Sequence, residues 1–251
     1  VNWTNYYNYC EDIGDGRGYT ISIVGFCSGT GDFIQVLYAL KSINPNHLLV
    51  KYIPLVEKVD GTSSTKGLEG LPGDLKKMGS NDKDFNKAAW SIIIKLYWGP
   101  AMAYAAKIGC VTPLTKYILY DTILNFGDLD GFKNLKSKPP AIGGDEKTWL
   151  AEFLNKKQSI IEKDGSLGDT KDNRVAMQKS ILAMNNTGLT SSTSVGSEGI
   201  IPKILADGET VGYTPGNLDI AKIHEITRVM DVNGAANQAL WMQDIYQNQN
   251  F

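Results

Sequence analysis

The sequence predicts a mainly α-helical protein with one small β element, organised as one large domain or as two lobes around a cleft. Two observations predict this fold class. Apolar residues recur at helix-type spacing along most of the chain, whereas strand-type alternation is confined to one short stretch near the N-terminus. A length of 251 residues is also enough to bury a sizeable hydrophobic core.

A glycine-rich segment near the N-terminus is the most distinctive local feature of the chain. Residues 14–18 read Gly-Asp-Gly-Arg-Gly, and glycines at alternate positions prevent a stable helix while permitting positive φ angles. We therefore predict a turn that presents Asp15 and Arg17. Aromatic and polar residues over 3–11 predict a helix or a helix end before this turn, and alternating apolar residues over 19–26 predict a short strand after it.

The rest of the chain is predicted to consist of helices and the polar connections between them. The first helix begins after a polar cap at residues 28–32 and is stopped by Asn44-Pro45-Asn46. Residues 61–84 and 187–199 are rich in glycine and hydroxyl residues and predict long surface connections. The predicted helices span residues 33–43, 47–56, 88–108, 114–126, 147–161, 174–184 and 218–246, with a short apolar segment at residues 200–205.

Composition and charge exclude several classes of protein. Hydrophobic residues make up 42% of the chain and charged residues 21%, which excludes disordered and low-complexity classes. The 25 Lys and Arg against 27 Asp and Glu give a formal net charge of −2, without the basic excess that most nucleic-acid binders use to neutralise phosphates. No apolar run approaches the roughly 20 residues needed to cross a bilayer. We expect neither a nucleic-acid nor a membrane partner.

The motifs of metal, nucleotide and nucleophilic sites are incomplete. His224-Glu225 begins like a zinc-binding His-Glu-x-x-His motif, but Arg228 occupies the position of the second histidine. There is no Gly-x-Ser-x-Gly elbow, and the glycines of residues 14–18 do not have the dinucleotide-binding spacing. We expect no metal and no cofactor. The three cysteines, Cys10, Cys27 and Cys110, could form one disulfide in any of three pairings, which would leave one free thiol.

Carboxylates and aromatic side chains are concentrated in the first part of the sequence. Catalysis on sugars uses carboxylates as general acid and base, while aromatic rings and hydroxyl groups hold a polyhydroxylated ring. An acidic cluster beside a turn can equally be a solvated face or a helix cap, so the pattern alone leaves both interpretations open. The carboxylates are Glu11, Asp12, Asp15 and Asp32, interleaved with Tyr6, Tyr7, Tyr9 and Tyr19 and with the hydroxyls of Thr20, Ser28 and Thr30.

Two longer motifs carry a resemblance to a known family. Residues 9–20 read Tyr-Cys-Glu-Asp-Ile-Gly-Asp-Gly-Arg-Gly-Tyr-Thr, and residues 25–32 read Gly-Phe-Cys-Ser-Gly-Thr-Gly-Asp. Both closely resemble the signature of the chitosanases of glycoside hydrolase family 46. The resemblance is dense over residues 3–55, patchy to about residue 190 and lost beyond it. Shorter matches follow in the family's order at residues 51–54, 120–121, 143–146 and 173–175.

This resemblance implies a fold and an activity. It implies a mostly α, two-lobed, lysozyme-like fold with a substrate cleft between the lobes, forming a single catalytic domain over residues 1–251. Residues 190–251 would be a divergent C-terminal extension packed on that domain. The implied enzyme is a secreted, extracellular monomer that cleaves chitosan, the β-1,4-linked glucosamine polymer, by endo action and with inversion.

The resemblance also implies roles for individual residues. It makes Asp15 the general base that activates the attacking water and Thr20 the hydroxyl that orients this water. The implied substrate-binding residues are Tyr9, Arg17, Thr30 and Asp32, with Asp32 pairing to a glucosamine ammonium. A buried charge network behind the site would contain Asp121, Arg174 and Lys157; the family has an Arg at the third position, so bidentate pairing is weakened here.

The physical chemistry agrees with Asp15 as a base, but the general acid is a separate question. Asp15 in a turn beside the Arg17 guanidinium should keep a low pKa and stay ionised. The family's general acid is a Glu upstream of the Trp that matches Trp3, which places it before Val1. Either a preceding segment supplies the acid, or the chain is a catalytically inactive chitosan-binding relative. Glu11 is the nearest carboxylate that could substitute.

Overall fold

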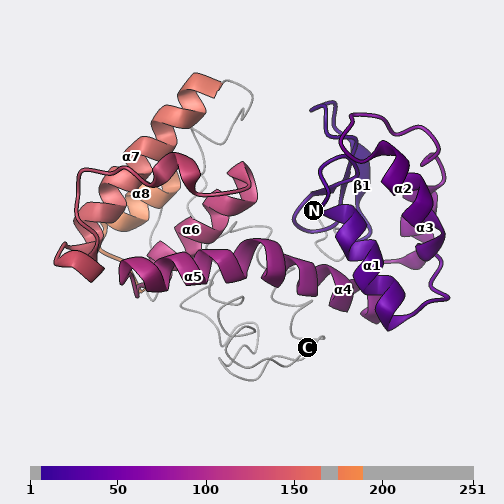
Figure 1. Ribbon diagram of the computed structural model, residues 1–251, viewed down its shortest axis with the longest axis horizontal. Coiled ribbons are helices and arrows are strands. Elements are labelled where there is room, and N and C mark those ends of the chain that lie inside the picture. Colours follow the sequence, from indigo (N-terminus) through magenta and orange to yellow (C-terminus); the bar gives the residue numbers. More distant parts are fainter. Residues whose placement is uncertain (1–6, 165–174, 189–251) are drawn as a thin grey trace. The chain divides into compact units, whose positions relative to one another are not determined.

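The computed structural model describes residues 7–164 and 175–188 (Figure 1). This part of the chain is mostly helical with one small sheet, as the sequence predicts. It forms two compact units, one on each side of the Leu96–Tyr97 bond. The C-terminal extension lies outside the described residues, as do the predicted elements at residues 200–205 and 218–246.

The sheet of the first unit has three antiparallel strands in the order β1-β2-β3. They are β1 (Cys10–Asp12), β2 (Tyr19–Ile21) and β3 (Phe26–Cys27). The sheet therefore comes entirely from the aromatic and glycine-rich N-terminal segment, and the Gly14 to Gly18 segment is the connection between its first two strands.

Two sequence predictions are wrong in this region. The described part of the predicted helix at residues 3–11 is a turn followed by β1, because these residues pair with β2. The single strand predicted over 19–26 is two strands. Ser22 and Gly25 have φ angles of 65° and 72°, which are incompatible with an extended strand and reverse the chain between β2 and β3.

The two faces of the sheet have different roles. Residues directly opposite each other on neighbouring strands point to the same face. One row is Cys10, Ile21 and Phe26, and the last two are fully buried in the core of the unit. The other row is Glu11, Thr20 and Cys27, so two residues of the predicted sugar site, Glu11 and Thr20, share the opposite face with Cys27.

Helix α1 (Phe33–Ile43) confirms the predicted helix over 33–43. It buries a stripe of apolar side chains at helical spacing, and it packs against α4 (Lys83–Ile93). The Asn44 side-chain amide at the end of α1 donates a hydrogen bond to Asp84 Oδ2 at the start of α4, at 2.9 Å. The two helices are therefore antiparallel, and the start of α1 lies near the end of α4.

The other helices of the first unit depart from the predictions. A 3₁₀ turn, η2 (Val50–Tyr52), and α2 (Ile53–Val59) replace the helix predicted over 47–56. Pro54 in the first turn of α2 explains the later start, because proline fits best where its missing N–H is not needed. The connection predicted over 61–84 contains α3 (Leu71–Met78), whose leucines are fully buried.

The helix predicted over 88–108 is interrupted. After α4 the chain makes a π-helical turn, η3 (Ile94–Trp98), before α5 (Gly99–Ile108). Pro100 lies in the first turn of α5 and has no N–H to donate to the preceding turn, so the regular α-helical ladder cannot continue through it. Apolar spacing alone does not reveal this break.

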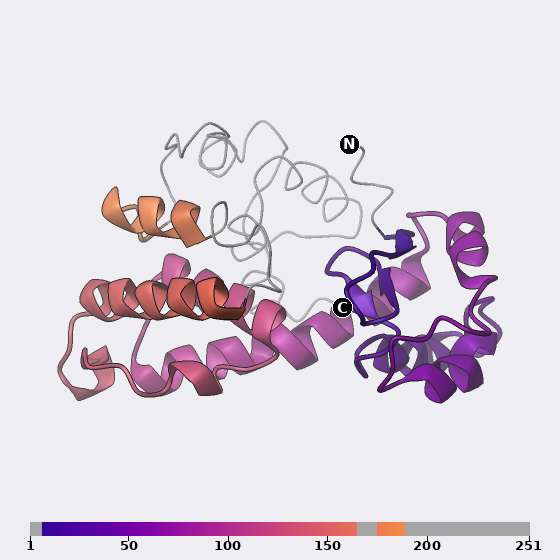
Figure 2. The ribbon, with the colours of Figure 1, turned by 90° about the horizontal axis from the view of Figure 1, so that it is seen from above.

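The second unit follows the predicted helices closely. Its main helices are α6 (Pro113–Phe126), α7 (Glu146–Asp164) and α8 (Ala176–Ala183), and α7 packs against α8 (Figure 2). Short 3₁₀ turns η4 (Asp130–Phe132) and η5 (Pro140–Ile142) join α6 to α7. Phe132 stacks on Phe153 of α7 with ring centroids 4.6 Å apart.

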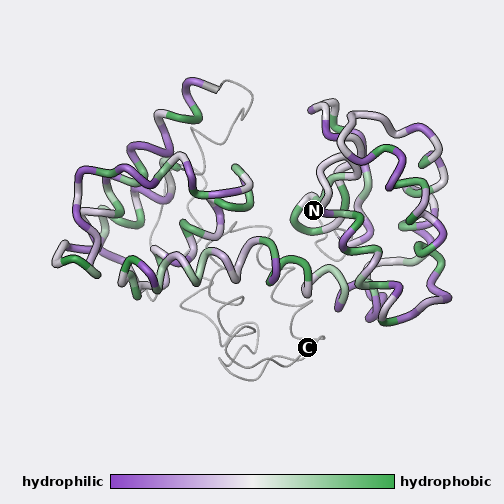
Figure 3. Tube along the Cα trace, in the orientation of Figure 1, coloured by the Kyte–Doolittle hydropathy of each residue, from purple (hydrophilic) through white to green (hydrophobic). Residues whose placement is uncertain are grey.

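Several helices of the two units are amphipathic, α1 and α4 among them, whereas α6 is buried along most of its length. Apolar and polar residues alternate along them (Figure 3), and the apolar positions make up the buried cores. In the first unit the fully buried Tyr7 accepts a hydrogen bond from Trp90 Nε1 at 3.1 Å. None of the helices in the described part of the chain combines the length and the apolar character needed to cross a bilayer.

Candidate active site

The connection between β1 and β2 presents the central charged pair of the candidate site. Gly14, Gly16 and Gly18 all have positive φ angles, between 73° and 81°, as the predicted turn requires. A side chain at Gly18 would place its Cβ 2.3 Å from Ser28 Oγ, which accepts a hydrogen bond from the Tyr19 amide. Glycine is therefore required at position 18 by both backbone conformation and space.

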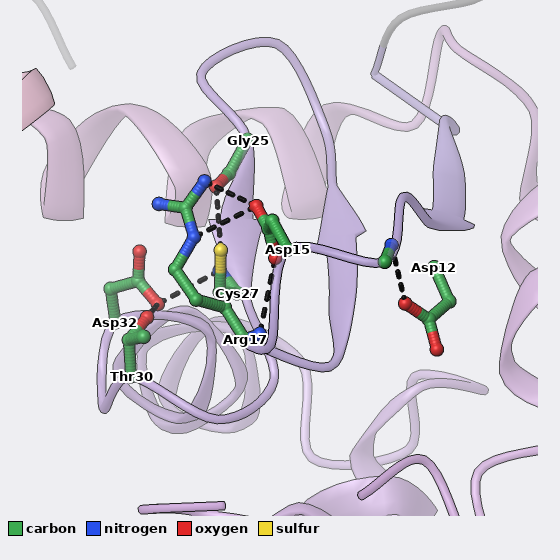
Figure 4. A network of polar contacts seen from close by, with 8 residues as sticks. Asp12, Asp15, Arg17, Gly25, Cys27, Thr30 and Asp32 are labelled. Carbon is green, nitrogen blue, oxygen red and sulfur yellow. Dashed lines mark hydrogen bonds and ion pairs between the residues drawn. The ribbon is translucent and has the colours of Figure 1, made fainter. Parts of the chain in front are cut away.

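Asp15 and Arg17 form a multiply hydrogen-bonded ion pair in this turn (Figure 4). Arg17 Nε and Nη2 donate to Asp15 Oδ2 at 2.9 and 2.5 Å, and the Arg17 amide donates to Asp15 Oδ1 at 3.1 Å. Burial acts to raise the pKa of Asp15, but the hydrogen bonds from Arg17 outweigh it and the pKa is lowered overall. Asp15 is therefore ionised at neutral pH.

Asp32 is fixed at the start of α1. Its Oδ1 accepts hydrogen bonds from the Cys27 amide and the Thr30 hydroxyl, both at 2.9 Å (Figure 4), and from the Phe33 amide at 2.8 Å. The last of these makes Asp32 the N-cap of the helix. The three donors set the orientation of the carboxylate and tie the Thr30 side chain to it.

Cys27 is a member of the site that the sequence analysis does not identify. Its sulfur lies between the Asp15–Arg17 pair and Asp32, and it donates a hydrogen bond to the Gly25 carbonyl at 3.3 Å (Figure 4). Burial raises the pKa of this thiol, so it is protonated and unsuited to act as a nucleophile. Its register opposite Thr20 could have identified it, had the strand pairing been known.

Glu11 and Tyr9 lie on the first strand and just before it. The Tyr9 hydroxyl donates to Glu11 Oε2 at 2.9 Å, and Glu11 pairs in register with Thr20. The Thr20 hydroxyl is buried, and none of the described residues forms a hydrogen bond with it. Thr20 therefore carries a buried hydroxyl without a partner among the described residues, on the face of the sheet that it shares with Glu11 and Cys27.

A neighbouring loop supports the Arg17 backbone from behind. The Gly29 amide donates to the Arg17 carbonyl at 3.0 Å, and the Gly29 carbonyl accepts from the Gly61 amide at 3.1 Å. A Cβ at Gly29 would lie 2.0 Å from the Thr62 carbonyl oxygen. Three backbone segments therefore meet at a glycine, which fixes the Asp15–Arg17 turn against the rest of the unit.

The second unit contains the buried charge pair that the resemblance implies. Asp121 on α6 and Lys157 on α7 are fully buried, with Lys157 Nζ 2.5 Å from Asp121 Oδ2. Gln178 on α8 donates to the same oxygen at 2.7 Å and to the Tyr117 hydroxyl at 3.1 Å, and accepts from Lys157 Nζ at 3.3 Å. Arg174 lies outside the described residues.

Gln178 and Tyr117 extend this network beyond the sequence-based hypothesis. Tyr117 and Asp121 are four residues apart on one helix, so their side chains share a face, and this spacing was a usable signal. Nothing in the local sequence marks Gln178. The structure shows three free thiols, and within its described ranges it brings no three His, Cys, Asp or Glu side chains together as a metal site.

Hydrolysis of a glycosidic bond is chemistry that suits these groups, because it needs an ionised carboxylate beside hydroxyl and aromatic side chains. Comparison with known proteins leads to the same class. The model of Glycosyl hydrolase family 46 matches residues 1–192. The chain belongs to this family and is a glycoside hydrolase, which confirms the resemblance found in the sequence.

The similar proteins are chitosanases. One from a Streptomyces species is 34% identical over 200 residues, covering 74% of this chain and 71% of that protein. A chitosanase from Bacillus subtilis is 32% identical over 209 residues, covering 76% and 75%. The solved structure of a mutant Bacillus subtilis chitosanase complexed with 6 GlcN matches with a TM-score of 0.69 and 30% identity, over 78% of this chain and 92% of that one.

Proposed function

We propose that this glycoside hydrolase cleaves chitosan, the β-1,4-linked glucosamine polymer, by endo action and with inversion at the anomeric carbon. The observation that carries the proposal is the Asp15–Arg17 pair, a carboxylate kept ionised in the turn that joins β1 to β2. The chitosanases among its relatives support the choice of substrate.

In this mechanism Asp15 is the general base. An inverting glycosidase needs an ionised carboxylate roughly 6.5 to 9.5 Å from its general acid, which leaves room for the attacking water. The lowered pKa of Asp15 keeps it in the ionised form over the working pH range. Thr20 would orient the water through its buried hydroxyl, which has no partner among the described residues.

Substrate recognition would depend on the carboxylate of Asp32. Each glucosamine unit carries one ammonium, and a charge-assisted hydrogen bond is among the stronger contacts available to a protein. The fixed orientation of Asp32 and its tie to Thr30 mean that little side-chain entropy would be lost on binding. Tyr9 and Arg17 would provide further contacts to the same part of the polymer.

The general acid would be the counterpart of the Glu that the family has upstream of the Trp matching Trp3, or else Glu11. The leaving oxygen must be protonated as the bond breaks, so an efficient reaction needs one of the two. We also propose, from the family, a secreted monomer with two lobes around the substrate cleft, with the Asp121, Lys157 and Arg174 network behind the site.

The decisive experiment is incubation of the protein with chitosan. We expect soluble oligosaccharides whose new reducing ends first appear as the α-anomer in an NMR time course. A β-anomer would overturn inversion, and products shortened one sugar at a time would overturn endo action. Binding of chitosan oligomers by a folded protein without any product would establish the alternative, an inactive chitosan-binding relative.

A further inference from the structure

A side-chain bridge supports the segment that carries Thr30 and Asp32. Gln35, in the first turn of α1, donates from Nε2 to the Gly31 carbonyl at 2.9 Å. Its Oε1 accepts a hydrogen bond from Lys95 Nζ, also at 2.9 Å. The Gly31 carbonyl belongs to the peptide bond that precedes Asp32, so the bridge fixes this peptide plane.

The Gln35 amide can form both contacts, whereas a carboxylate or an ammonium cannot. The Lys95 ammonium can only donate and the Gly31 carbonyl can only accept, so the bridging group needs one acceptor and one donor. A carboxylate at position 35 would pair with Lys95 but would turn an oxygen toward the Gly31 carbonyl. The amide orientation of Gln35 is therefore set by its two partners.

The residues on both sides of this peptide are restrained as well. Gly31 has a φ of 77°, a conformation that residues other than glycine rarely adopt. Asp32 is held by the three hydrogen bonds to Oδ1 described above. Gln35 of α1 adds a side-chain hydrogen bond to the carbonyl of this peptide. The Gln35 side chain is itself held by Lys95, which lies on another element.

That other element is the π-helical turn η3, which carries Lys95. Such turns are rare, and they occur frequently at functional sites. Since α1 and α4 are antiparallel, the turn that follows α4 lies beside the start of α1, where Lys95 reaches Gln35. The exposed Lys95 thus connects the π-helical turn η3 to the segment that carries Thr30 and Asp32.

We propose that Gln35 and Lys95 are positioning residues for substrate binding. They fix the peptide between Gly31 and Asp32, and through it the side chains of Thr30 and Asp32, in the geometry that holds a glucosamine unit. This proposal rests on the proposed function. It assigns the bridge to binding rather than to the chemical step, because neither residue needs to touch the reacting atoms.

Gln35→Glu is the sharpest test. It keeps the size of the side chain and gains an ion pair with Lys95, but it loses the donor to the Gly31 carbonyl. One net hydrogen bond corresponds to roughly 2- to 12-fold in a binding constant. We expect KM for chitosan to rise about 3- to 10-fold while kcat changes less than about 2-fold. An unchanged KM would show that the bridge only stabilises the fold, and would overturn the proposal.

Substitutions of Lys95 distinguish its role in holding the Gln35 amide from a simple effect of its positive charge on the cationic polymer. Lys95→Ala should raise KM about 2- to 5-fold, because the Gln35 amide loses its anchor, and Lys95→Arg should restore it. If Lys95 acted only by repelling the cationic polymer, Lys95→Ala would instead lower KM, which would contradict the proposal. Lys87→Ala is the matched control, since Lys87 is an exposed lysine of α4. It should leave KM and kcat unchanged.

Hydrogen exchange tests the positioning without using activity. The Cys27 and Phe33 amides donate to Asp32 Oδ1, so their exchange reports how firmly this carboxylate is held. In Gln35→Glu both amides should exchange at least about 3-fold faster, and unchanged rates would overturn the proposal. If the parent protein neither binds nor cleaves chitosan, the proposed function fails, while the exchange rates still decide whether the bridge holds Asp32.

Discussion

Glu11 on β1 and Thr20 on β2 lie directly opposite each other, with their side chains on the same face of the sheet. This register places the nearest candidate for a substitute acid beside the hydroxyl that would orient the attacking water. The same face carries Cys27 on β3, whose amide donates a hydrogen bond to Asp32 Oδ1 (Figure 4). The short sheet thus gathers the site from three separate sequence segments.

Glu11→Gln tests whether this neighbour supplies the proton. Glu11 is exposed and accepts a hydrogen bond from Tyr9, whereas the resemblance to the family puts the general acid upstream of the Trp that matches Trp3. We expect kcat to fall less than about 10-fold, as measured by reducing-end release. A fall of about 10²-fold or more, with KM unchanged, would identify Glu11 as the general acid.

Asp15→Asn should lower kcat by about 10² to 10⁴-fold, because a positioned base contributes on this order. The ion pair with Arg17 is partly exposed, so its loss should change the free energy of unfolding by less than about 1 kcal/mol. Turnover and thermal unfolding measured on the same preparation check both statements. Asp12→Asn is the control, since Asp12 caps the Gly14 amide in the same turn. Equal effects of the two variants would contradict the role of Asp15.

The pH dependence follows from the lowered pKa of Asp15. A carboxyl whose pKa is lowered in the folded state contributes stability above its ordinary pKa of about 4, and this stability is lost as the pH falls through the lowered pKa. Arg17→Ala removes the side-chain donors, so the pKa of Asp15 should rise. The acid limb of the pH profile of kcat/KM should then move to higher pH. A limb at the same pH in both proteins would show that another group controls it.

Lys157→Met should destabilise the second unit strongly. It would leave the Asp121 carboxylate buried without its ammonium partner, at a cost of about 3 to 5 kcal/mol in the free energy of unfolding. Chemical denaturation measures this change. Lys156→Met, at the neighbouring exposed position of α7, should change stability by less than about 1 kcal/mol. A small effect at position 157 would mean that Gln178 compensates for the lysine.

Ser22→Gly should stabilise the protein. Ser22 has a φ of 65°, is almost fully buried, and its hydroxyl forms no hydrogen bond with any described residue. Glycine removes both the backbone strain and the unsatisfied hydroxyl, but it raises the conformational entropy of the unfolded chain. We expect the free energy of unfolding to increase by about 1 kcal/mol in total. An increase in Tm checks this. A decrease would show that the buried hydroxyl has a favourable partner.

Helical periodicity predicts the parts of this fold whose order is local. Helices α1, α6 and α7 each show several apolar residues at helical spacing between clear start and stop signals, and their predicted ranges agree closely with the structure. Helix α3 was missed because glycine, proline and lysine fill most positions around its two buried leucines. One short strand of the sheet was predicted, but its division into β2 and β3 and the pairing with β1 were missed, because strands of two or three residues are too short to show a clear alternation.

In the candidate site, too, contacts between residues close in sequence could be predicted, and contacts between separate helices could not. Asp15 and Arg17 are two residues apart in a turn, so local sequence is enough to bring them together. The tie between Gln35 and Lys95 spans 60 residues and depends on the packing of α1 against α4. Gln178 is likewise invisible in the sequence, because its partners Tyr117 and Asp121 lie on another helix.

The three unpaired cysteines have a practical consequence for producing the enzyme. Burial raises the pKa of Cys10 and of Cys110 to about 12, and it also raises the pKa of Cys27, so all three sulfurs stay protonated and unreactive at ordinary pH. They are the only cysteines of the chain. The described fold therefore uses no disulfide among these three residues, and the protein can be stored and assayed in the presence of dithiothreitol.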